Sequence, residues 1–395
     1  MLKNTSPVIR LEQGLPPLSV YIHVPWCVRK CPYCDFNSHA LKGDLPEAEY
    51  LQALEMDLVA TLPQIWGRPI HTVFIGGGTP SLLSAQAMER IMGMLRQLLN
   101  IAPDTEVTLE ANPGTIEAQR FKDYASVGIN RISLGVQSFH DGALQRLGRI
   151  HDSAQARRAI EMAQAAVKRV NIDLMYALPA QSLEDCKQDI QSALAFGTEH
   201  LSLYNLMLEP NTVFAKYPPN DLPDDDTAAL MQDTLIELTA EAGFQQYEVS
   251  AYARPGARTK HNLNYWEFGD YIGIGPGAHG KISMHNQIIR TAKVRGPDSW
   301  MQKVLEGQGQ HIVETRSLQP ADLPFEFMLN ALRLKEGVPT HYYAERTGTD
   351  LSLMTAQIDT AVAKGLLDAD PRYLKATELG WRYLNDLQAI FLADE

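Results

Sequence analysis

The sequence predicts an α/β protein built on a partial (β/α)6 barrel, followed by a smaller C-terminal domain of winged-helix-like type. Three observations carry this prediction. Short apolar segments alternate with longer segments of helical periodicity over about 200 residues. Polar or glycine-rich residues follow nearly every one of the short segments. From about residue 310 the alternation stops, and helical patterns predominate.

The short segments are predicted as strands because they are apolar and rich in β-branched residues or tyrosine. They are residues 18–24, 72–75, 106–110, 131–136, 171–176 and 201–206. Between them, apolar residues recur every three or four positions, as in 88–99 and 228–242, which predicts amphipathic helices. Gly243 is the expected end of the second of these helices. Six successive β–α units predict parallel strands joined by helical crossovers.

An open doubly wound sheet and a barrel both have this alternation, and the residues after the strands favour the barrel. A cysteine cluster follows the first strand, a Gly-Gly-Gly-Thr-Pro run the second, and Asn-Pro-Gly the third. Gln137 follows the fourth strand, and Asp173 lies within the fifth. A barrel builds its site from the carboxyl ends of many strands, whereas a doubly wound sheet concentrates it at one switch point. We therefore expect a partial barrel.

The C-terminal region combines helices with a predicted small hairpin. Residues 325–335 and 353–364 are predicted as helices, and 366–369 and 373–376 as short strands. Thr377 is the expected cap of a last helix, which gives the winged-helix-like pattern. The expected division is a short N-terminal segment (1–17), the barrel (18–245), a segment capping the barrel (246–309) and the C-terminal domain (310–395).

Composition and charge exclude several classes of protein. The chain has 395 residues, 45% hydrophobic and 21% charged, which is ordinary for a globular protein. Its net charge of −12 disfavours nucleic-acid binding, including the DNA binding usual for winged-helix domains. The sequence shows neither a membrane-spanning apolar stretch nor a signal peptide. We expect a cytoplasmic protein with at most peripheral membrane contact, and whether it dimerises stays open.

Three of the four cysteines form a cluster on the loop after the first strand. Cys27, Cys31 and Cys34 have the spacing C-x3-C-x2-C, whereas Cys186 is isolated and is expected to be an incidental surface or helix-face thiol. Two metal sites match three close thiolates. One is a structural zinc site completed by His23 or His39, and the other is a [4Fe–4S] cluster with one iron left open. The spacing alone does not decide between them.

The residues around the cluster carry a resemblance. The segments Tyr21-Ile-His23-Val-Pro-Trp-Cys27 and Cys31-Pro-Tyr33-Cys34-Asp-Phe-Asn resemble the radical S-adenosylmethionine (SAM) superfamily, and more narrowly the group that contains oxygen-independent coproporphyrinogen III oxidase. Matches continue in order at 76–81, 110–114, 135–139, 146–149, 173–176 and Pro179. The resemblance implies a [4Fe–4S] cluster on Cys27, Cys31 and Cys34, with SAM bound at the open iron.

Within this group, the sequence looks like the haem-chaperone branch. The oxidase has a further cysteine two residues after the third cluster cysteine, where this chain has Phe36, and it has a long N-terminal extension where this chain has 17 residues. The run His261-Asn262-Leu-Asn-Tyr265-Trp266 matches the HNxxYW segment of the chaperone branch. This implies a protein that binds haem and delivers it to respiratory haemoproteins without coproporphyrinogen oxidase activity. The alternative is the oxidase itself, so whether the chain is an enzyme stays open.

The resemblance also implies roles in SAM binding. The residues are Tyr21, Tyr33, Gly77, Gly78, Thr79, Glu110, Gln137, Arg149 and Asp173. The glycines would turn backbone groups to the methionine moiety, Glu110 would accept from its ammonium, and Arg149 would pair with its carboxylate. Gln137 and Asp173 would bind the ribose, Tyr33 would lie near the adenine, and Tyr21 near the cluster. Taken singly, each of these is more typical of a structural polar residue, except Asp173, which lies inside an apolar strand and requires a partner. No catalytic residue is assigned.

The haem candidates are His261 as axial ligand, with Tyr265 and Trp266 stacking on the macrocycle. Basic residues nearby, Arg254, Arg258 and Lys260, would meet the propionates. His279 and His285 are rival ligands, and an ordinary loop histidine among packed aromatics is the alternative. The run from Gly275 to Gly280 matches G-x-G-x-x-G but lacks the acidic strand end of a dinucleotide site, so we expect a loop over the top of the barrel.

Overall fold

The computed structural model describes residues 8–115 and 118–393. The six predicted strands are present as β1 (Leu18–Val24), β4 (Pro69–Gly77), β5 (Asn100–Ala111), β6 (Arg131–Gln137), β7 (Arg169–Tyr176) and β8 (His200–Asn205). They are neighbours in this order, and every adjacent pair is parallel. The predicted α/β fold with a parallel barrel-like core is therefore confirmed.

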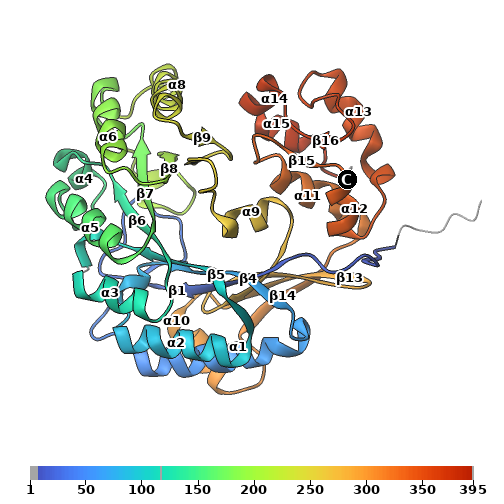
Figure 1. The fold of residues 1–395 in the computed structure, drawn as a ribbon, viewed down its shortest axis with the longest axis horizontal. Helices are drawn as coiled ribbons and strands as arrows, with labels where there is room; N and C mark the ends of the chain where they lie inside the picture. Colours follow the sequence, from blue (N-terminus) through green and yellow to red (C-terminus); the bar gives the residue numbers. More distant parts are fainter. Residues whose placement is uncertain (1–7, 116–117, 394–395) are drawn as a thin grey trace, which may run out of the picture.

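Helical crossovers connect these strands around the outside of the curved sheet (Figure 1). They are α1 (Glu47–Ile65), α2 (Ala85–Leu98), α3 (Ala118–Ser126), α5 (Ser153–Ala166) and α6 (Leu183–Ala195), with the short helix α4 (Asp141–Arg146). The short helix α7 (Val213–Lys216) and the longer α8 (Asp225–Glu241) follow β8. Side-chain caps fix several helix starts. Ser84 accepts from the third amide of α2, and Asp152 and Ser182 form capping boxes at α5 and α6.

The two faces of each barrel strand have different residues. In β1, Val20 and Ile22 are fully buried in the main hydrophobic core, which includes Leu58 of α1 and Ile91 of α2. Because successive side chains of a strand point to opposite faces, the alternate residues of each strand point into the barrel. In β7 these include Asp173, so the alternation places a carboxyl group inside the barrel.

The sheet continues beyond the six predicted strands on both sides. Its further strands are β9 (Gln245–Gln246), β10 (Ala251–Ala253), β11 (Asp270–Ile274), β12 (His279–Met284), β13 (Gln287–Lys293) and β14 (Ile312–Ser317). Among the described residues, the sheet has twelve strands in the order β14-β13-β12-β11-β1-β4-β5-β6-β7-β8-β10-β9. Strand β11 is parallel to β1, and β12 to β14 follow antiparallel. The predicted boundaries after residues 17, 245 and 309 stay predictions, and residues 1–7 lie outside the described part.

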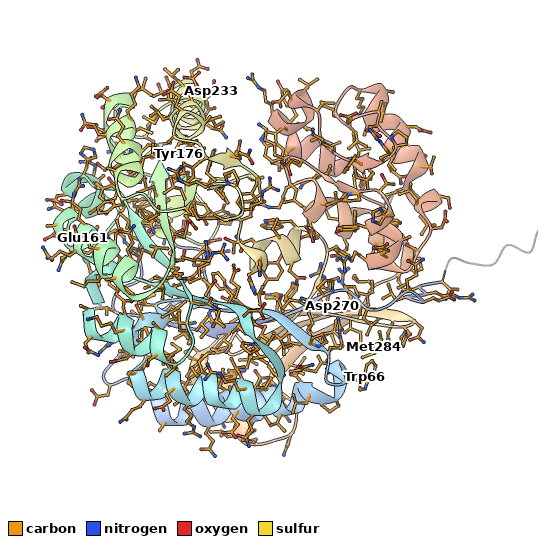
Figure 2. The ribbon with its side chains drawn as sticks, in the orientation of Figure 1. Trp66, Glu161, Tyr176, Asp233, Asp270 and Met284 are labelled. Atoms are coloured by element: carbon orange, nitrogen blue, oxygen red, sulfur yellow. The ribbon has the colours of Figure 1, made fainter. Side chains whose placement is uncertain are left out.

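A buried ionic cluster holds this added part of the sheet together. Asp270, labelled in Figure 2, is completely buried at the start of β11. It accepts hydrogen bonds of 2.8 Å from Lys281 Nζ of β12 and from Arg68 Nη2 just before β4. A buried carboxylate requires such partners.

Helix α10 (Pro297–Leu305) packs its buried Trp300 against Tyr50 of α1.

The C-terminal helices form a second body beside the barrel (Figure 1). They are α11 (Leu323–Ala331), α12 (His341–Thr347), α13 (Thr355–Ala363), α14 (Glu378–Arg382) and α15 (Leu384–Ala389). They enclose their own hydrophobic cluster, which includes Phe327 and Tyr343. No helix in the described part of the chain is both long and apolar enough to cross a bilayer.

Two local predictions for this region are corrected. The expected hairpin between 366–369 and 373–376 is reduced to one bridge, Leu367 with Ala376. Tyr373–Leu374 (β16) pairs instead with Val338–Pro339 (β15). The last helix does begin after Thr377, but it divides at Tyr383, whose backbone is not helical. Tertiary pairing therefore overrides the local strand preference here.

Candidate functional site

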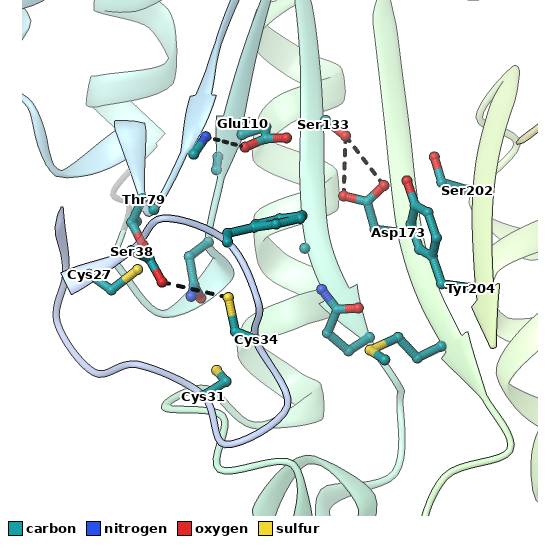
Figure 3. A pocket seen from close by; sticks show the side chains of 18 of the residues that line it. Cys27, Cys31, Cys34, Ser38, Thr79, Glu110, Ser133, Asp173, Ser202 and Tyr204 are labelled. Carbon is teal, nitrogen blue, oxygen red and sulfur yellow. Dashed lines mark hydrogen bonds between the residues drawn. The ribbon is translucent and has the colours of Figure 1, made fainter. Parts of the chain in front are cut away.

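A cavity of about 420 Å³ opens inside the barrel, between the cysteine loop and the inner faces of the strands. It is lined by Cys27, Cys31, Cys34, Tyr33, Gly77, Gly78, Thr79, Glu110, Gln137, Arg149 and Asp173. The structure therefore brings together all three cluster cysteines and every predicted SAM residue except Tyr21. Figure 3 shows the cysteines on one loop facing Glu110 and Asp173 on their strands.

The cysteine loop is held by short contacts around the thiols. Strand β2 (Trp26–Cys27) pairs with β3 (His39–Ala40), which closes the loop between them. The Cys34 thiol lies 3.5 Å from the Ser38 hydroxyl (Figure 3). Burial raises the pKa of the Cys27 and Cys34 thiols above the usual value. Thiolates at these positions therefore need a compensating positive charge, which a bound iron–sulfur cluster supplies.

A zinc site on these cysteines would need His23 or His39 as its fourth ligand, whereas a [4Fe–4S] cluster with one open iron would not. Both ring nitrogens of His23 are engaged, by the Tyr21 hydroxyl at 2.9 Å and the Asn37 carbonyl at 2.8 Å. The Nε2 atom of His39 lies 3.3 Å from the Asn37 side-chain oxygen. Among the described residues, no group of three or more histidine, cysteine or acidic side chains is placed to hold a single ion. The engaged nitrogens of His23 make it a poor fourth ligand for a zinc ion, and the cluster on the three cysteines stays a prediction.

The glycine run after β4 is required by close backbone packing. Gly77 has φ +114°, and a Cβ there would lie 2.6 Å from the His23 ring. A Cβ on Gly78 would lie 2.6 Å from the Trp26 carbonyl oxygen. The N–H groups of Gly77 and Gly78 donate to Glu110 and to the Val24 carbonyl. These two amide N–H groups are therefore used within the protein, and the binding of a methionine moiety by other backbone groups of the run stays a prediction.

Two buried carboxyl groups lie inside the cavity. Burial raises the pKa of Glu110 to about 7, although the hydrogen bond from the Gly77 amide opposes this shift. Burial likewise raises the pKa of Asp173 to about 6. Asn171 Nδ2 donates to Asp173 at 2.6 Å, and the Ser133 hydroxyl donates at 3.2 Å (Figure 3). A cationic ligand group near these carboxyls would favour their ionised forms.

Arg149 and Gln137 complete the cavity on the side of the cysteines. Arg149 donates from Nη2 to the Gly135 carbonyl at 2.7 Å, and its Nη1 lies 3.6 Å from the Cys31 sulfur. The Nε atom of Arg149 is buried with no hydrogen-bond partner among the described residues. Gln137 has a left-handed backbone, with φ 71°. Strain of this kind is frequent at ligand sites, and an unpaired guanidinium N–H fits a ligand carboxylate.

The segment with the haem candidates is a helix that packs against the barrel. Helix α9 (Lys260–Trp266) contacts β1, β4 and β11. The His261 ring lies 2.7 Å from the Thr72 hydroxyl through Nδ1 and 3.0 Å from the Tyr265 hydroxyl through Nε2. His261 is only 1% exposed, and burial lowers its pKa to about 3. It therefore matches the alternative of a satisfied structural histidine and presents no free nitrogen to an iron.

The other haem candidates on this segment are also engaged. The Arg333 guanidinium lies over the Trp266 ring, 4.3 Å from its centroid. Arg258 forms an ion pair with Glu336 at 2.9 Å, and Arg254 lies over the ring of Phe244. Arg254, Arg258 and Trp266 therefore already have partners, which speaks against the expected basic patch and stacking platform at these three residues. Of the three candidates, Tyr265 lines a second cavity described below.

That second cavity, of about 700 Å³, adjoins the first. Both are lined by Phe36, Gly77 and Glu110. Tyr21 points into this second cavity, together with Tyr265, Tyr271 and His279. That Tyr21 lies near a bound cluster stays a prediction. His285, the other rival ligand, lies 3.2 Å from the Leu11 carbonyl through Nδ1 and lines neither of these cavities.

Several residues of the first cavity escaped sequence reasoning. They are Arg131, Ser133, Asn171, His200, Ser202 and Tyr204. His200 is fully engaged, with Nδ1 2.6 Å from Asn171 and Nε2 2.9 Å from the Tyr247 hydroxyl. These residues alternate with core residues along β6, β7 and β8, so the period-two pattern of the strands was the signal that would have found them.

The structure also shows where Cys186 and the glycine run from Gly275 to Gly280 lie. Cys186 is not a surface thiol, because it lies on the inner side of α6 and is 1% exposed. The glycine run from Gly275 to Gly280 joins β11 to β12, and Asn37 of the cysteine loop donates to the Pro276 carbonyl at 3.0 Å. This turn therefore lies against the cysteine loop.

Known proteins are similar to this chain over nearly its whole length. The model of the radical SAM superfamily matches residues 21–193, and that of the HemN C-terminal domain matches 318–383. The chain is 49% identical to the heme chaperone HemW of Escherichia coli strain K12, over 96% of this chain and 99% of that protein. It is 46% identical to HemW of Haemophilus influenzae, with the same coverage of both proteins.

A mouse protein and one solved structure extend the comparison. The mitochondrial radical S-adenosyl methionine domain-containing protein 1 of Mus musculus is 36% identical over 95% of this chain and 87% of its own length. The structure of the coproporphyrinogen III oxidase HemN of Escherichia coli superposes with a TM-score of 0.81, covering 99% of this chain and 97% of that one. At 22% identity, this likeness shows the shared fold alone.

Proposed function

Because the chain belongs to the radical SAM superfamily and, within it, to the family of the heme chaperone HemW, we propose that it is a cytoplasmic haem chaperone. It would bind haem, a [4Fe–4S] cluster and SAM, and deliver the haem to respiratory haemoproteins. The observation that carries this proposal is the 49% identity to a heme chaperone over nearly the full length of both chains. Similarity limited to the barrel would support the superfamily and no particular function.

The residues of the first cavity support the cofactor part of this proposal. Cys27, Cys31 and Cys34 would hold the cluster, and the open iron would receive the amino and carboxylate groups of SAM. A reduced cluster with SAM supplies a 5′-deoxyadenosyl radical in this superfamily. Arg149, whose Nε lacks a partner among the described residues, would hold the methionine carboxylate.

The remaining cavity residues would orient the rest of SAM. Glu110 would accept a hydrogen bond from the methionine amino group, since its carboxyl group lies beside the glycine run and near the cysteine loop. Gln137 and Asp173 would bind the ribose hydroxyls, and Tyr33, which lies 3.4 Å from Arg149, would lie near the adenine. Gly77 and Gly78 would shape the wall by allowing close packing, and Thr79 lines the same cavity.

The absence of oxidase activity is the second part of the proposal. Phe36 occupies the position where the oxidase has its further cysteine, and its side chain is 58% exposed at the border of the two cavities. A phenyl ring can neither carry a proton nor ligate a metal. The likeness to the HemN structure does not weaken this proposal, because at 22% identity it concerns the fold alone.

Haem transfer is the direct test of the chaperone role. Haem-loaded protein is mixed with a haem-free respiratory haemoprotein, and the spectrum of the acceptor is followed. Free haem at the same concentration serves as the control. We expect transfer from the protein to yield more correctly loaded acceptor than free haem does. Equal yields from both sources would contradict delivery. Size-exclusion chromatography of the same samples shows whether the chaperone acts as a monomer or a dimer.

A further inference from the structure

We propose that the haem is seated in the second cavity, with the imidazole of His279 as its axial ligand. This inference rests on the function proposed above and names the site at which the cargo is held. It differs from the sequence-based expectation, in which His261 was the ligand.

The availability of the ring nitrogens distinguishes His279 from its neighbours. His279 begins β12, its side chain is exposed, and it lines the second cavity. Among the described residues, it has no side-chain hydrogen bond or ion pair. His23, which lines the same cavity, and His261 each have both nitrogens bound. Because an axial ligand must give a nitrogen lone pair to the iron, only His279 of these three is ready to bind.

The walls of the cavity suit a flat aromatic ligand. Its volume of about 700 Å³ lies within the roughly 300–1,000 Å³ typical of ligand pockets. Tyr265 and Tyr271 stand edge to face, with ring centroids 4.6 Å apart, and form one aromatic wall. Phe36 and Val313 are 58% and 61% exposed at the border of the cavity. Exposed apolar side chains beside a cavity indicate a ligand that covers them.

The charged groups around His279 suit the propionates of haem. Arg295 lines the cavity and has no side-chain hydrogen bond or ion pair among the described residues. Arg290 and Arg295 both act electrostatically on His279, and Glu314 acts in the opposite sense. Lys293 also lines the cavity, but its ammonium is bound to Asp57, which removes it as a partner. Arg295 is therefore the cation available for a propionate, in a chain whose net charge is −12.

The position of this cavity also places the haem beside the SAM site. Phe36, Gly77 and Glu110 line both cavities. Bound haem would therefore cover the exposed ring of Phe36 and close one side of the first cavity. This arrangement explains in physical terms why an exposed phenylalanine is tolerated on the cysteine loop.

The test is a titration of ferric haem into cluster-loaded protein, followed by optical difference and electron paramagnetic resonance spectra. The variants are His279→Gly, His261→Gly and, as a matched exposed control, His341→Gly in the C-terminal region. We expect His279→Gly to lose the signature of histidine ligation and to bind haem about ten- to hundredfold more weakly. Added imidazole should restore that signature in His279→Gly, because the small ligand refills the vacated position.

The outcomes separate this inference from the proposed function. If the wild-type protein binds no haem, the chaperone proposal fails and the site proposal fails with it. If wild type binds and His279→Gly has the same spectrum and affinity, the site assignment is overturned while the chaperone proposal stands. Loss of the ligation signature in His261→Gly, with rescue by imidazole, would also overturn the assignment of His279 as the ligand. Arg295→Gln should weaken binding without changing the ligation spectrum, and an unchanged affinity would contradict the propionate contact.

Discussion

The backbone N–H of Gly77 donates a 2.9 Å hydrogen bond to a carboxylate oxygen of Glu110. This bond joins the glycine run after β4 to the end of β5 and fixes the carboxyl group at the border of the two cavities. The second carboxylate oxygen has no hydrogen bond to another described residue. The carboxyl group is therefore held in place with one oxygen left for a ligand, and its raised pKa makes that ligand's binding sensitive to pH.

The affinity for SAM should depend on pH through Glu110. Its pKa is raised from 4.5 to about 7 by burial, so the carboxyl group is mostly ionised at pH 8 and mostly protonated at pH 6. Since a hydrogen bond from the methionine amino group requires the ionised, accepting form of Glu110, affinity should fall by up to about tenfold per pH unit below the pKa. Calorimetry of SAM binding between pH 6 and 8 measures this. Glu110→Gln should bind SAM weakly, and its SAM affinity should not show this dependence on pH.

Without SAM, the same group affects stability in a defined direction. Because the folded protein holds the Glu110 proton more tightly than the unfolded chain, this group's contribution to stability falls as the pH rises from 4.5 to about 7. Glu110→Gln should remove that part of the pH dependence in denaturant titrations. An identical pH dependence for the variant and the wild type would show that Glu110 is not the buried carboxyl described here.

Adding one methyl group at Gly77 should damage the site. In Gly77→Ala, the backbone at φ +114° and the contact of 2.6 Å with the His23 ring cannot both be kept. We expect a loss of about 1–3 kcal/mol of stability, with weaker SAM binding. Gly93→Ala in α2 is the matched control, because nothing lies within 4 Å of its Cβ position. That change should be neutral or stabilising by up to about 1 kcal/mol. Denaturant unfolding measures the stability of both variants. Equal free energies of unfolding for Gly77→Ala and Gly93→Ala would contradict the packing argument.

The cluster should depend on three cysteines and be independent of the fourth. Replacing Cys27, Cys31 or Cys34 by serine should abolish bound iron and sulfide in anaerobically reconstituted protein. Cys186→Ala should keep both, since Cys186 is buried on α6 and lines neither cavity. In Cys186→Ala, the free energy of unfolding should fall by about 1 kcal/mol, because the smaller side chain fills less of the buried volume. Loss of the cluster in Cys186→Ala would refute the assignment, as would bound zinc without sulfide in the wild type.

Arg149 should contribute directly to SAM affinity. Removing a charge-assisted hydrogen-bond partner costs about 1.5–3 kcal/mol, or roughly ten- to hundredfold in affinity. Calorimetry on Arg149→Ala with an intact cluster measures this loss. Arg149→Lys keeps the charge but not the planar fork, so it should recover only part of the affinity. SAM affinity equal to the wild type in both variants would place the methionine carboxylate elsewhere.

The barrel and the cofactor cavity were predictable because both depend on local order in the sequence. Apolar alternation places the strands, and parallel strands bring their carboxyl ends to one edge. Cys27, Glu110, Gln137 and Arg149 were therefore expected near one another, and they line one cavity. Ser133 and Asn171 were missed because small polar residues within strands have no motif of their own, although their positions alternate with the core.

The sequence left His261, His279 and His285 open as haem ligands, because the choice among them depends on which side chains have partners. His261 lies in the recognisable HNxxYW segment, yet Thr72 and Tyr265 occupy both of its nitrogens. His279 lies in a glycine-rich turn without a haem motif, and only the pairing of β11, β12 and β13 places it in a cavity. The sequence also could not show that Tyr21 lines the second cavity, because two adjoining cavities open there.

The central claim is that this protein carries haem and does not oxidise coproporphyrinogen. The measurement that tests it most directly is one anaerobic experiment on reduced, cluster-loaded protein with SAM. One sample receives haem and another receives coproporphyrinogen III, and the products are separated by chromatography. The account predicts stoichiometric haem binding and unchanged coproporphyrinogen III. Protoporphyrinogen IX formed over multiple turnovers would contradict it and identify the protein as an oxidase.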